Sequence, residues 1–224
     1  FHSISELPSG ARVGIVGAGL SGIELASELR ESRSDLEILL YDRGPRILRN
    51  FPEKLSKYIS KWFSKHDVTV VPNSVIDRVE PGKIYNNGQP EDIDLVVWTA
   101  GIQPVEVVRN LPIDLSNTGR VILNQYHQVP TYKNVYVVGD CADLPHAPSA
   151  QLAELQGDQI ADVLKKQWNN ESLPDKMPEI KIQGFLGSLG DKQGFAYIMD
   201  RTVTGRLASI LKSGVLWLYK YHNG

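Results

Sequence analysis

The sequence predicts an α/β fold with a Rossmann-like domain, and two separated strand–turn signatures predict it. Residues 12–22 combine a short apolar strand, a glycine-rich turn and the start of an amphipathic helix. Residues 134–140 form a second apolar strand that ends in Gly-Asp. Because ligands of parallel sheets bind beyond the carboxyl ends of the strands, each signature indicates a binding site. The chain is therefore expected to contribute to two nucleotide sites.

The first turn has the Gly-x-Gly-x-x-Gly spacing at Gly17, Gly19 and Gly22. The first glycine permits a tight turn, the second lets the backbone approach a pyrophosphate, and the third lets the helix pack close to the sheet. The helix that starts at Leu20 directs free N–H groups and a partial positive charge at the phosphates. This turn is predicted to bind a dinucleotide, in preference to a strand–turn–helix with incidental glycines.

The next apolar strand, residues 36–41, ends at Asp42, which lies 20 positions after Gly22. An acid at this place accepts hydrogen bonds from the adenosine ribose and repels a 2′-phosphate. The sequence therefore favours NADH over NADPH. Arg43 opposes that preference, because an arginine can bind the additional phosphate of NADPH.

Composition excludes several classes of protein. A net charge of −2 and the absence of a basic stripe give no indication of a nucleic-acid partner. Cys141 is the single cysteine, so the segment holds no disulfide framework and no redox cysteine pair. The five histidines have no metal-ligand spacing, and no metal site is expected. No signal peptide or membrane-spanning run is present, and both ends indicate a fragment.

The periodicity of apolar residues predicts alternating strands and helices along the chain, with a hairpin signal at residues 86–88. Helices are predicted over residues 20–30, 52–65 and 148–168 and from about residue 206, and strands over residues 13–16, 36–41, 68–71, 75–79, 83–85, 93–98, 121–124, 134–138, 185–189 and 195–199.

The second signature has the chemistry expected of a flavin site. Asp140 can accept hydrogen bonds from a polyol such as the flavin ribityl chain. The positive end of the helix that begins near Pro148 can stabilise a flavin carbonyl when the ring gains negative charge. The alternative is a simple strand-ending turn, since Gly-Asp turns are common.

These stretches resemble the type II NADH:quinone oxidoreductases, which are single-subunit, non-proton-pumping respiratory NADH dehydrogenases of the two-dinucleotide flavoprotein group. The resemblance covers nearly the whole chain, and Trp-Thr-Ala-Gly and Ala-Gln-x-Ala are its more specific motifs. The matching stretches are residues 16–26, 98–104, 135–142 and 147–153, with residues 189–217 also compatible.

The resemblance implies an FAD/NAD(P)-binding fold in three parts. Residues 1–104 would be the NAD(H)-binding domain, residues 105–170 the C-terminal part of an FAD domain, and residues 171–224 a small α+β subdomain. The glycine motif of the FAD domain would lie upstream of Phe1. The implied reaction passes a hydride from NADH to FAD and electrons on to ubiquinone or menaquinone, at the cytoplasmic face of the cell membrane.

The resemblance also implies roles for individual residues. Glu24 would orient the nicotinamide or assist proton movement. The alternative is that Glu24 is only an acid in the first turn of the helix, where it complements the helix dipole. Gln151 would face the flavin and the quinone head group. Leu155 departs from the family, which usually has a glutamine there, and an apolar side chain cannot hydrogen-bond a quinone carbonyl. The residues expected to bind the cofactors are Gly17, Gly19, Leu20, Gly22, Asp42, Arg43, Ala100, Gly101, Gly139, Asp140, Ala150, Gln151 and Leu152.

The C-terminal helix has apolar residues on one face, with Trp217 at its edge, and Arg206, Ser209, Lys212, Ser213 and Lys220 on the other. The apolar set is Leu207, Ile210, Leu211, Val215, Leu218 and Tyr221. This pattern predicts either an in-plane membrane helix or a helix that covers a core or a homodimer interface.

Two other functions stay open. One is a flavoprotein reductase with a different acceptor, such as a disulfide, a small redox protein or oxygen. A sulfide-oxidising enzyme is disfavoured, because only Cys141 is present. The other is a nucleotide-sensing module that binds NADH without catalysis.

Overall fold

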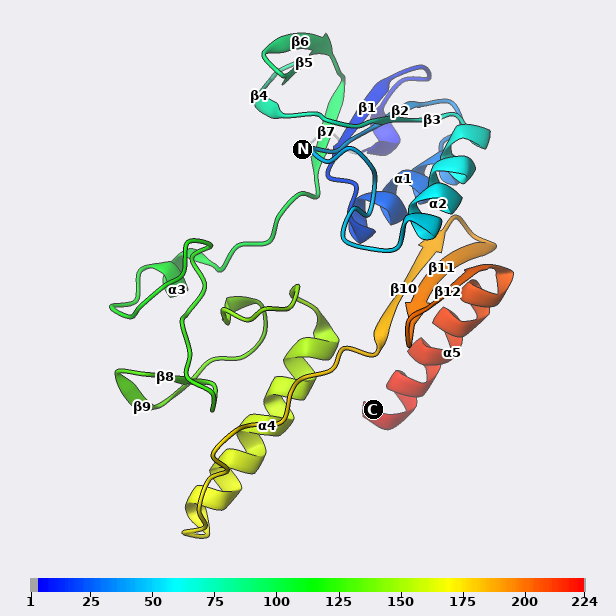
Figure 1. The fold of residues 1–224 in the computed structure, drawn as a ribbon. Coiled ribbons are helices and arrows are strands. Elements are labelled where there is room, and N and C mark those ends of the chain that lie inside the picture. The colour runs from blue at the N-terminus through cyan, green and yellow to red at the C-terminus, as the bar shows by residue number, and fades with distance from the viewer. Residues whose placement is uncertain (1–3, 224) are drawn as a thin grey trace. The chain divides into compact units, whose positions relative to one another are not determined.

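The computed structural model describes residues 4–223, without the side chains of residues 216, 218–220, 222 and 223. The chain forms two compact units, which we call unit 1 (Phe1–Ala100 with Gln183–Gly224) and unit 2 (Gly101–Ile182) (Figure 1). Residues 183–224 therefore share a unit with the N-terminal hundred residues, although more than eighty residues separate them in the sequence.

Unit 1 is built on a four-stranded parallel sheet with the strand order β3-β2-β1-β7. All three strand pairings in this sheet are parallel. A short 3₁₀ helix, η1 (Ile4–Glu6), precedes it. The strands are β1 (Arg12–Val16), β2 (Glu37–Tyr41), β3 (Val68–Val71) and β7 (Leu95–Trp98).

Both faces of this sheet are covered, which explains why its strands are apolar at nearly every position. Helices α1 (Leu20–Ser32) and α2 (Glu53–Lys65) pack on one face, where Val13 and Ile15 of β1 are fully buried. On the other face Val16 joins a smaller core with Tyr41 and Ile84. That face is covered by an antiparallel meander of β4 (Ile76–Glu80), β5 (Lys83–Asn86) and β6 (Gln89–Asp92).

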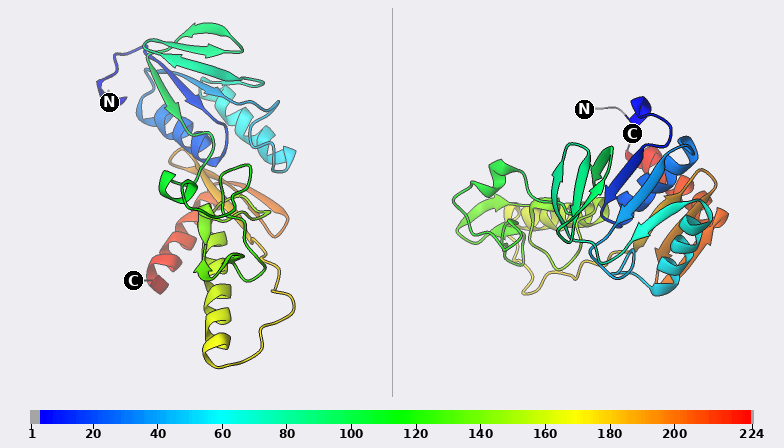
Figure 2. Two further views of the ribbon diagram at one scale, coloured as in Figure 1. Left: turned by 90° about the vertical axis from the view of Figure 1, so that its left-hand side faces the viewer. Right: turned by 90° about the horizontal axis from the view of Figure 1, so that it is seen from above.

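A second antiparallel sheet packs on the outer side of α1 and α2. It consists of β10 (Gly184–Leu189), β11 (Gln193–Ile198) and β12 (Arg201–Gly205), and α5 (Arg206–Asn223) follows it. Leu189 and Phe195 are fully buried in the same core as the apolar residues of α1 and α2. Helices α1 and α2 therefore lie between two sheets (Figure 2).

Unit 2 has few buried apolar side chains and depends on polar contacts. Its elements are α3 (Glu106–Arg109), β8 (Gln128–Val129), β9 (Tyr132–Tyr136), the 3₁₀ turn η2 (Gly139–Cys141) and α4 (Ala150–Trp168). His127, which is buried, contacts Gln159 of α4 through Nε2 at 2.8 Å. Gln159 in turn donates to the carbonyl of Pro178 at 2.7 Å.

The α/β fold class predicted from the sequence is confirmed, and the long helices lie within two residues of the predicted bounds. The predicted strand over residues 121–124 is wrong. Within it only Val121 makes β-bridges, to Leu115 and Ala142. Short elements such as α3, β6, β8 and β12 were not predicted, because their apolar residues are too few to set a periodicity.

Gly187 provides a test of the packing of the second sheet. Gly187 pairs with Phe195 across β10 and β11, and a Cβ at Gly187 would overlap the Phe195 ring. We expect Gly187→Ala to lower the free energy of unfolding by about 2 kcal/mol, because a fully buried ring must move. The matched control is Gly214→Ala in α5, where a Cβ meets open space. It should leave stability unchanged or raise it by up to about 1 kcal/mol. Urea denaturation followed by circular dichroism measures both, and equal losses would contradict the packing argument.

Candidate nucleotide site

The turn between β1 and α1 is fixed by close backbone contacts. Gly17 has φ +108° and donates its N–H to the carbonyl of Tyr41 at 2.8 Å. A Cβ at Gly17 would come within 2.9 Å of the Ala100 backbone. Gly17 is therefore required both by its backbone conformation and by the approach of the chain that leaves β7.

The other two glycines of the motif have different roles. A Cβ at Gly22 would overlap the carbonyl oxygen of Gly17 and lie 2.9 Å from Thr99 Oγ1. A Cβ at Gly19 would meet no atom within 4 Å. Gly22 is thus needed for the helix to approach the turn, whereas no neighbouring atom of the chain occupies the space at Gly19.

Thr99 joins β7 to this turn. Its hydroxyl lies 3.0 Å from the carbonyl oxygens of both Val16 and Gly17, to which it donates, and its N–H donates to Val16 O at 2.9 Å. The neighbouring Trp98 donates from Nε1 to the carbonyl of Ala100 at 2.8 Å and is half exposed at the carboxyl end of β7. The Trp-Thr-Ala-Gly motif therefore closes the side of the glycine turn.

Asp42 holds the turn from the β2 side. One carboxylate oxygen accepts the N–H of Ala18 at 2.8 Å, and the other accepts the N–H of Gly44 at 2.7 Å. A carboxylate offers about four acceptor positions, so Asp42 retains capacity for a ligand hydroxyl. The predicted contact of Asp42 with a ribose stays a prediction. Its role in organising the turn was not foreseen from the sequence.

Glu24 lies in α1 and connects this helix to the C-terminal segment. Its Oε1 accepts the N–H of Ser188 at 2.7 Å and the ammonium of Lys212 at 2.6 Å. The Lys212 ammonium also donates to the hydroxyl of Ser188 at 2.5 Å. The two charged side chains are about one-third exposed, so this is a partly shielded ion pair that joins α1, β10 and α5. The predicted nicotinamide role of Glu24 stays a prediction.

The Gly-Asp turn of unit 2 rests on a buried glutamine. Gly139 has φ +75°, and its N–H donates to Gln156 Oε1 at 2.9 Å. Gln156 is fully buried, and its Nε2 has no hydrogen-bond partner among the described residues. Gln156 was not among the site residues predicted from the sequence. Gln156 lies one helical turn after the buried Leu152, and this spacing could have indicated that it shares the inward face of α4.

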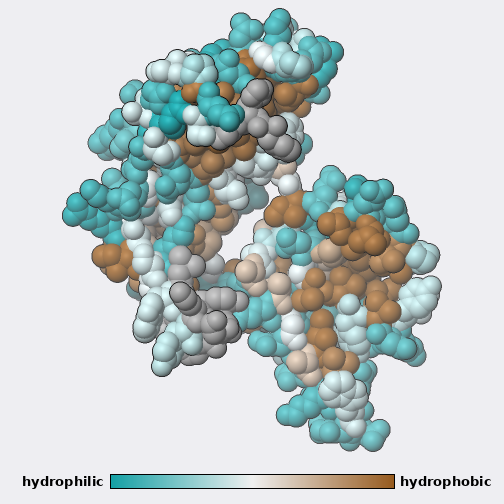
Figure 3. Space-filling model, turned by 180° about the vertical axis from the view of Figure 1, so that it is seen from behind, coloured by the Kyte–Doolittle hydropathy of each residue, from teal (hydrophilic) through white to brown (hydrophobic). Residues whose placement is uncertain are grey.

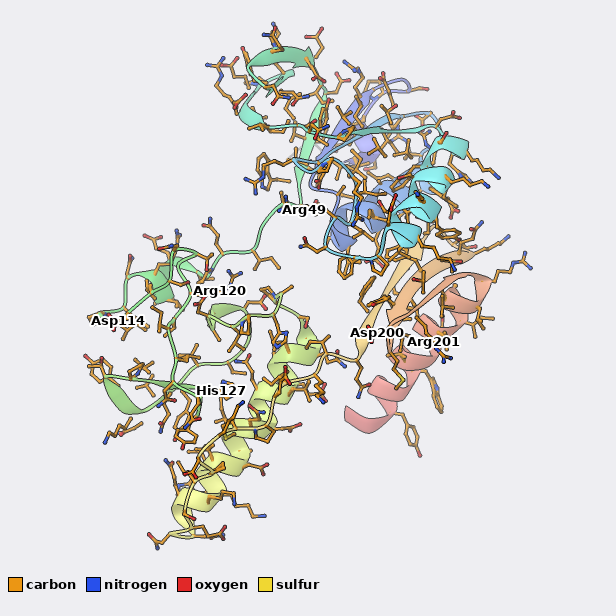
Figure 4. The ribbon with its side chains drawn as sticks, in the orientation of Figure 1. Arg49, Asp114, Arg120, His127, Asp200 and Arg201 are labelled. Atoms are coloured by element: carbon orange, nitrogen blue, oxygen red, sulfur yellow. The ribbon has the colours of Figure 1, made fainter. Side chains whose placement is uncertain are left out.

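Arg120 and Ser149 complete this turn. Arg120 donates from Nε to the carbonyl of Asp140 at 3.1 Å and from a second nitrogen to the carbonyl of Ile102 at 3.0 Å (Figure 4). Ser149 caps α4 by accepting the N–H of Leu152 at 3.2 Å. The first turn of α4 contains no acid, so its partial positive charge is not neutralised locally.

The structure distributes the predicted site residues between the units. Unit 1 holds Glu24, Leu20, Arg43, the three glycines of the motif, Asp42 and Ala100, and unit 2 holds Gly101, Gly139, Asp140, Ala150, Gln151 and Leu152. No group of three or more metal-ligating side chains occurs within residues 4–223.

Helix α5 exposes its apolar residues. Ala208 is buried and Lys212 contacts Glu24, so α5 packs on the rest of unit 1 through a side that includes part of the predicted polar face, whereas Arg206 and Ser213 of that face are exposed. Ile210 is 67% exposed, and Trp217 and Tyr221 stack on each other with ring centroids 5.6 Å apart. Leu218 was predicted on the apolar face and Lys220 on the polar face, and both are outside the set of side chains that the structure describes. No helix in the described part of the chain is long and apolar enough to cross a membrane.

A parallel α/β domain whose glycine turn joins β1 to α1, with an acid after β2, is a dinucleotide-binding domain. The family model described as pyridine nucleotide-disulphide oxidoreductase matches residues 2–157. The chain belongs to this family.

The names of two relatives agree with the family that the sequence resembles. An NADH dehydrogenase-like protein of Bacillus subtilis is 54% identical over 100% of this chain and 63% of its own length. A type II NADH:quinone oxidoreductase of Staphylococcus epidermidis is 26% identical over 88% of this chain and 54% of its own. The chain thus spans less than two thirds of these relatives.

Solved structures show the same fold. NDH2 from Plasmodium falciparum in complex with NADH matches with a TM-score of 0.75 at 15% identity, over 92% of this chain and 61% of that one. The sulfide:quinone oxidoreductase of Aquifex aeolicus matches with a TM-score of 0.75 at 18% identity, over 96% and 59%.

Thr99 tests the closure of the glycine turn. We expect Thr99→Val to lower the free energy of unfolding by about 1–2 kcal/mol, because two carbonyl groups lose a hydroxyl donor in a partly buried place. Thr99→Ser retains the hydroxyl and is the matched control. Thermal denaturation compares the two variants, and a Thr99→Val variant as stable as the wild type would contradict the role of the hydroxyl.

Proposed function

We propose that this chain provides the NADH site and the C-terminal part of the FAD site of a type II NADH dehydrogenase, which passes electrons from NADH through FAD to a quinone. The observation that carries the proposal is the open space at Gly19, on a turn that Asp42, Thr99 and Gly22 hold in place. The names of the relatives support the same activity.

In this proposal the residues of unit 1 bind and orient the nucleotide. The N–H groups in the first turn of α1 attract the pyrophosphate, and Gly19 lets it approach the backbone. Asp42 uses its remaining acceptor capacity for the adenosine ribose. The half-exposed Trp98 lies at the same carboxyl edge of the sheet.

The residues of unit 2 fit a flavin. When bound, FAD supplies a two-electron acceptor for NADH and passes the electrons to a second substrate. Asp140 would accept hydrogen bonds from the ribityl chain, and the N-terminus of α4 at Ala150 and Gln151 would stabilise negative charge on the ring. The unpartnered Nε2 of the buried Gln156 is consistent with a polar ligand at this turn.

Unit 2 also exposes apolar surface that a longer protein can cover. Val105, Val107 and Val135 are among its exposed large apolar side chains, and apolar residues gather on one face of the unit (Figure 3). In this proposal the remainder of the FAD domain, which the longer relatives contain, packs against unit 2.

The second candidate is a flavoprotein reductase with an acceptor other than a quinone. Leu155 favours it, because this half-buried residue lies one turn after Gln151 on α4 and has no polar group to bind a quinone carbonyl. The NADH and flavin sites are common to both candidates, so the acceptor alone distinguishes them.

The experiment that tests the proposal uses the full-length protein under anaerobic conditions. NADH should bleach the flavin absorbance, and a soluble quinone should restore it rapidly. Bleaching without recovery by the quinone would support the second candidate. A protein that binds no flavin would contradict both and leave a nucleotide-binding module.

Substitutions at Gly19 and Gly22 distinguish an effect on NADH binding from an effect on folding. We expect Gly19→Ala to weaken NADH binding by at least about tenfold with unchanged stability, because its methyl group enters open space where the pyrophosphate would lie. Gly22→Ala should lower both, since its methyl group overlaps the Gly17 carbonyl. Titration of protein fluorescence and thermal denaturation measure the two effects. Unchanged NADH affinity in Gly19→Ala would contradict this placement of the nucleotide.

We further propose that α5 binds the cytoplasmic face of the cell membrane, with a homodimer contact as the alternative use of its apolar side. Leu207 and Ile210 are both more than 60% exposed. Replacing both by Gln should lower binding to anionic lipid vesicles about tenfold. Ser213→Gln, an exposed change on the same helix, is the control. Sedimentation with vesicles measures binding, and a change of oligomeric state with unaltered vesicle binding would favour the dimer.

A further inference from the structure

The loop that follows Asp42 is strongly basic. Residues 42–49 contain one acid and three arginines, Arg43, Arg46 and Arg49, which gives the segment a formal charge of +2. This charge lies immediately after β2, at the place where the adenosine ribose of a bound dinucleotide is expected.

Only one of these arginines serves the fold. Arg46 donates to the carbonyls of Leu48, Arg49 and Phe51 over 2.7–3.0 Å, which closes the loop before α2. Arg43 and Arg49 are exposed, and among the side chains that the structure describes neither guanidinium has a hydrogen-bond or ion-pair partner. Their charges are therefore available to a ligand.

Arg49 lies beside the Asp42 carboxylate. A Cβ at Gly44 would be 3.0 Å from Asp42 Oδ1 and 3.1 Å from Arg49 Cδ, so the two side chains approach the same glycine. Arg43 follows Asp42 directly. Two cationic residues thus accompany the one acid in the loop after β2.

The Asp42 carboxylate is also engaged toward the protein. Both of its oxygens accept backbone N–H groups, from Ala18 and Gly44, and these bonds offset its negative charge. Repulsion of a neighbouring phosphate by Asp42 is consequently weaker than that of a carboxylate directed at the ligand.

We propose that the adenosine end of the site accepts a 2′-phosphate on Arg43 and Arg49, and that the protein binds NADPH as well as NADH. Arginine is suited to this because its planar guanidinium binds phosphate oxygens in pairs. The inference rests on the proposed nucleotide site and extends its range of substrates.

The test uses adenosine 2′,5′-bisphosphate and ADP, which contain no nicotinamide and do not react. Calorimetry with the full-length protein should show that the bisphosphate binds at least as tightly as ADP. The double variant Arg43→Gln/Arg49→Gln should weaken the bisphosphate about tenfold and change ADP less than about twofold. Arg201→Gln, which removes one positive charge at an exposed position of β12, should alter neither.

Steady-state kinetics provide a second readout. The double variant should lower kcat/KM for NADPH about tenfold more than kcat/KM for NADH, and this difference should shrink as salt is added. Tight binding of ADP with bisphosphate binding at least about tenfold weaker would overturn the inference, as would equal weakening of both ligands in the double variant. If neither ADP nor the bisphosphate bound, that result would instead contradict the nucleotide site itself.

Discussion

The close approach of α1 to the turn after β1 is the constraint on which unit 1 depends. It is possible only because Gly22 has no side chain to meet the carbonyl of Gly17. Thr99 from β7 and Asp42 from β2 then hold the same turn from both sides. Three strands and one helix therefore converge on a few backbone atoms, and the open space at Gly19 is the result.

The same helix is held on its outer side by residues more than 160 positions away. Glu24 contacts Ser188 and Lys212, and the buried Phe195 shares the core of α1. An ion pair of this kind contributes modestly to stability, but it fixes the orientation of α5 against α1. It ties α5, with its exposed apolar side, to the helix whose N-terminus faces the nucleotide site. The proposed membrane helix and the proposed NADH site thus belong to one packed unit.

Unit 2 is organised differently, by polar contacts around one turn. Gln156 fixes Gly139, and Arg120 links the carbonyls of Asp140 and Ile102. In the proposed function, additional chain would cover its exposed apolar side chains, and a ligand would meet the unpartnered Nε2 of Gln156. The greater length of the relatives agrees with this view.

The sequence by itself determined the α/β class, the glycine turn, the long helices and the family. Each of these depends on local spacing, as in Gly17, Gly19 and Gly22 and in the apolar strands. Only the tertiary structure decided which surfaces those elements present. It showed that Asp42 binds Ala18 and Gly44, that Arg46 is engaged while Arg43 and Arg49 are not, and that α5 packs through Ala208 and Lys212. Helical periodicity identifies two faces but does not reveal which one meets the protein, since that choice depends on partners distant in the sequence.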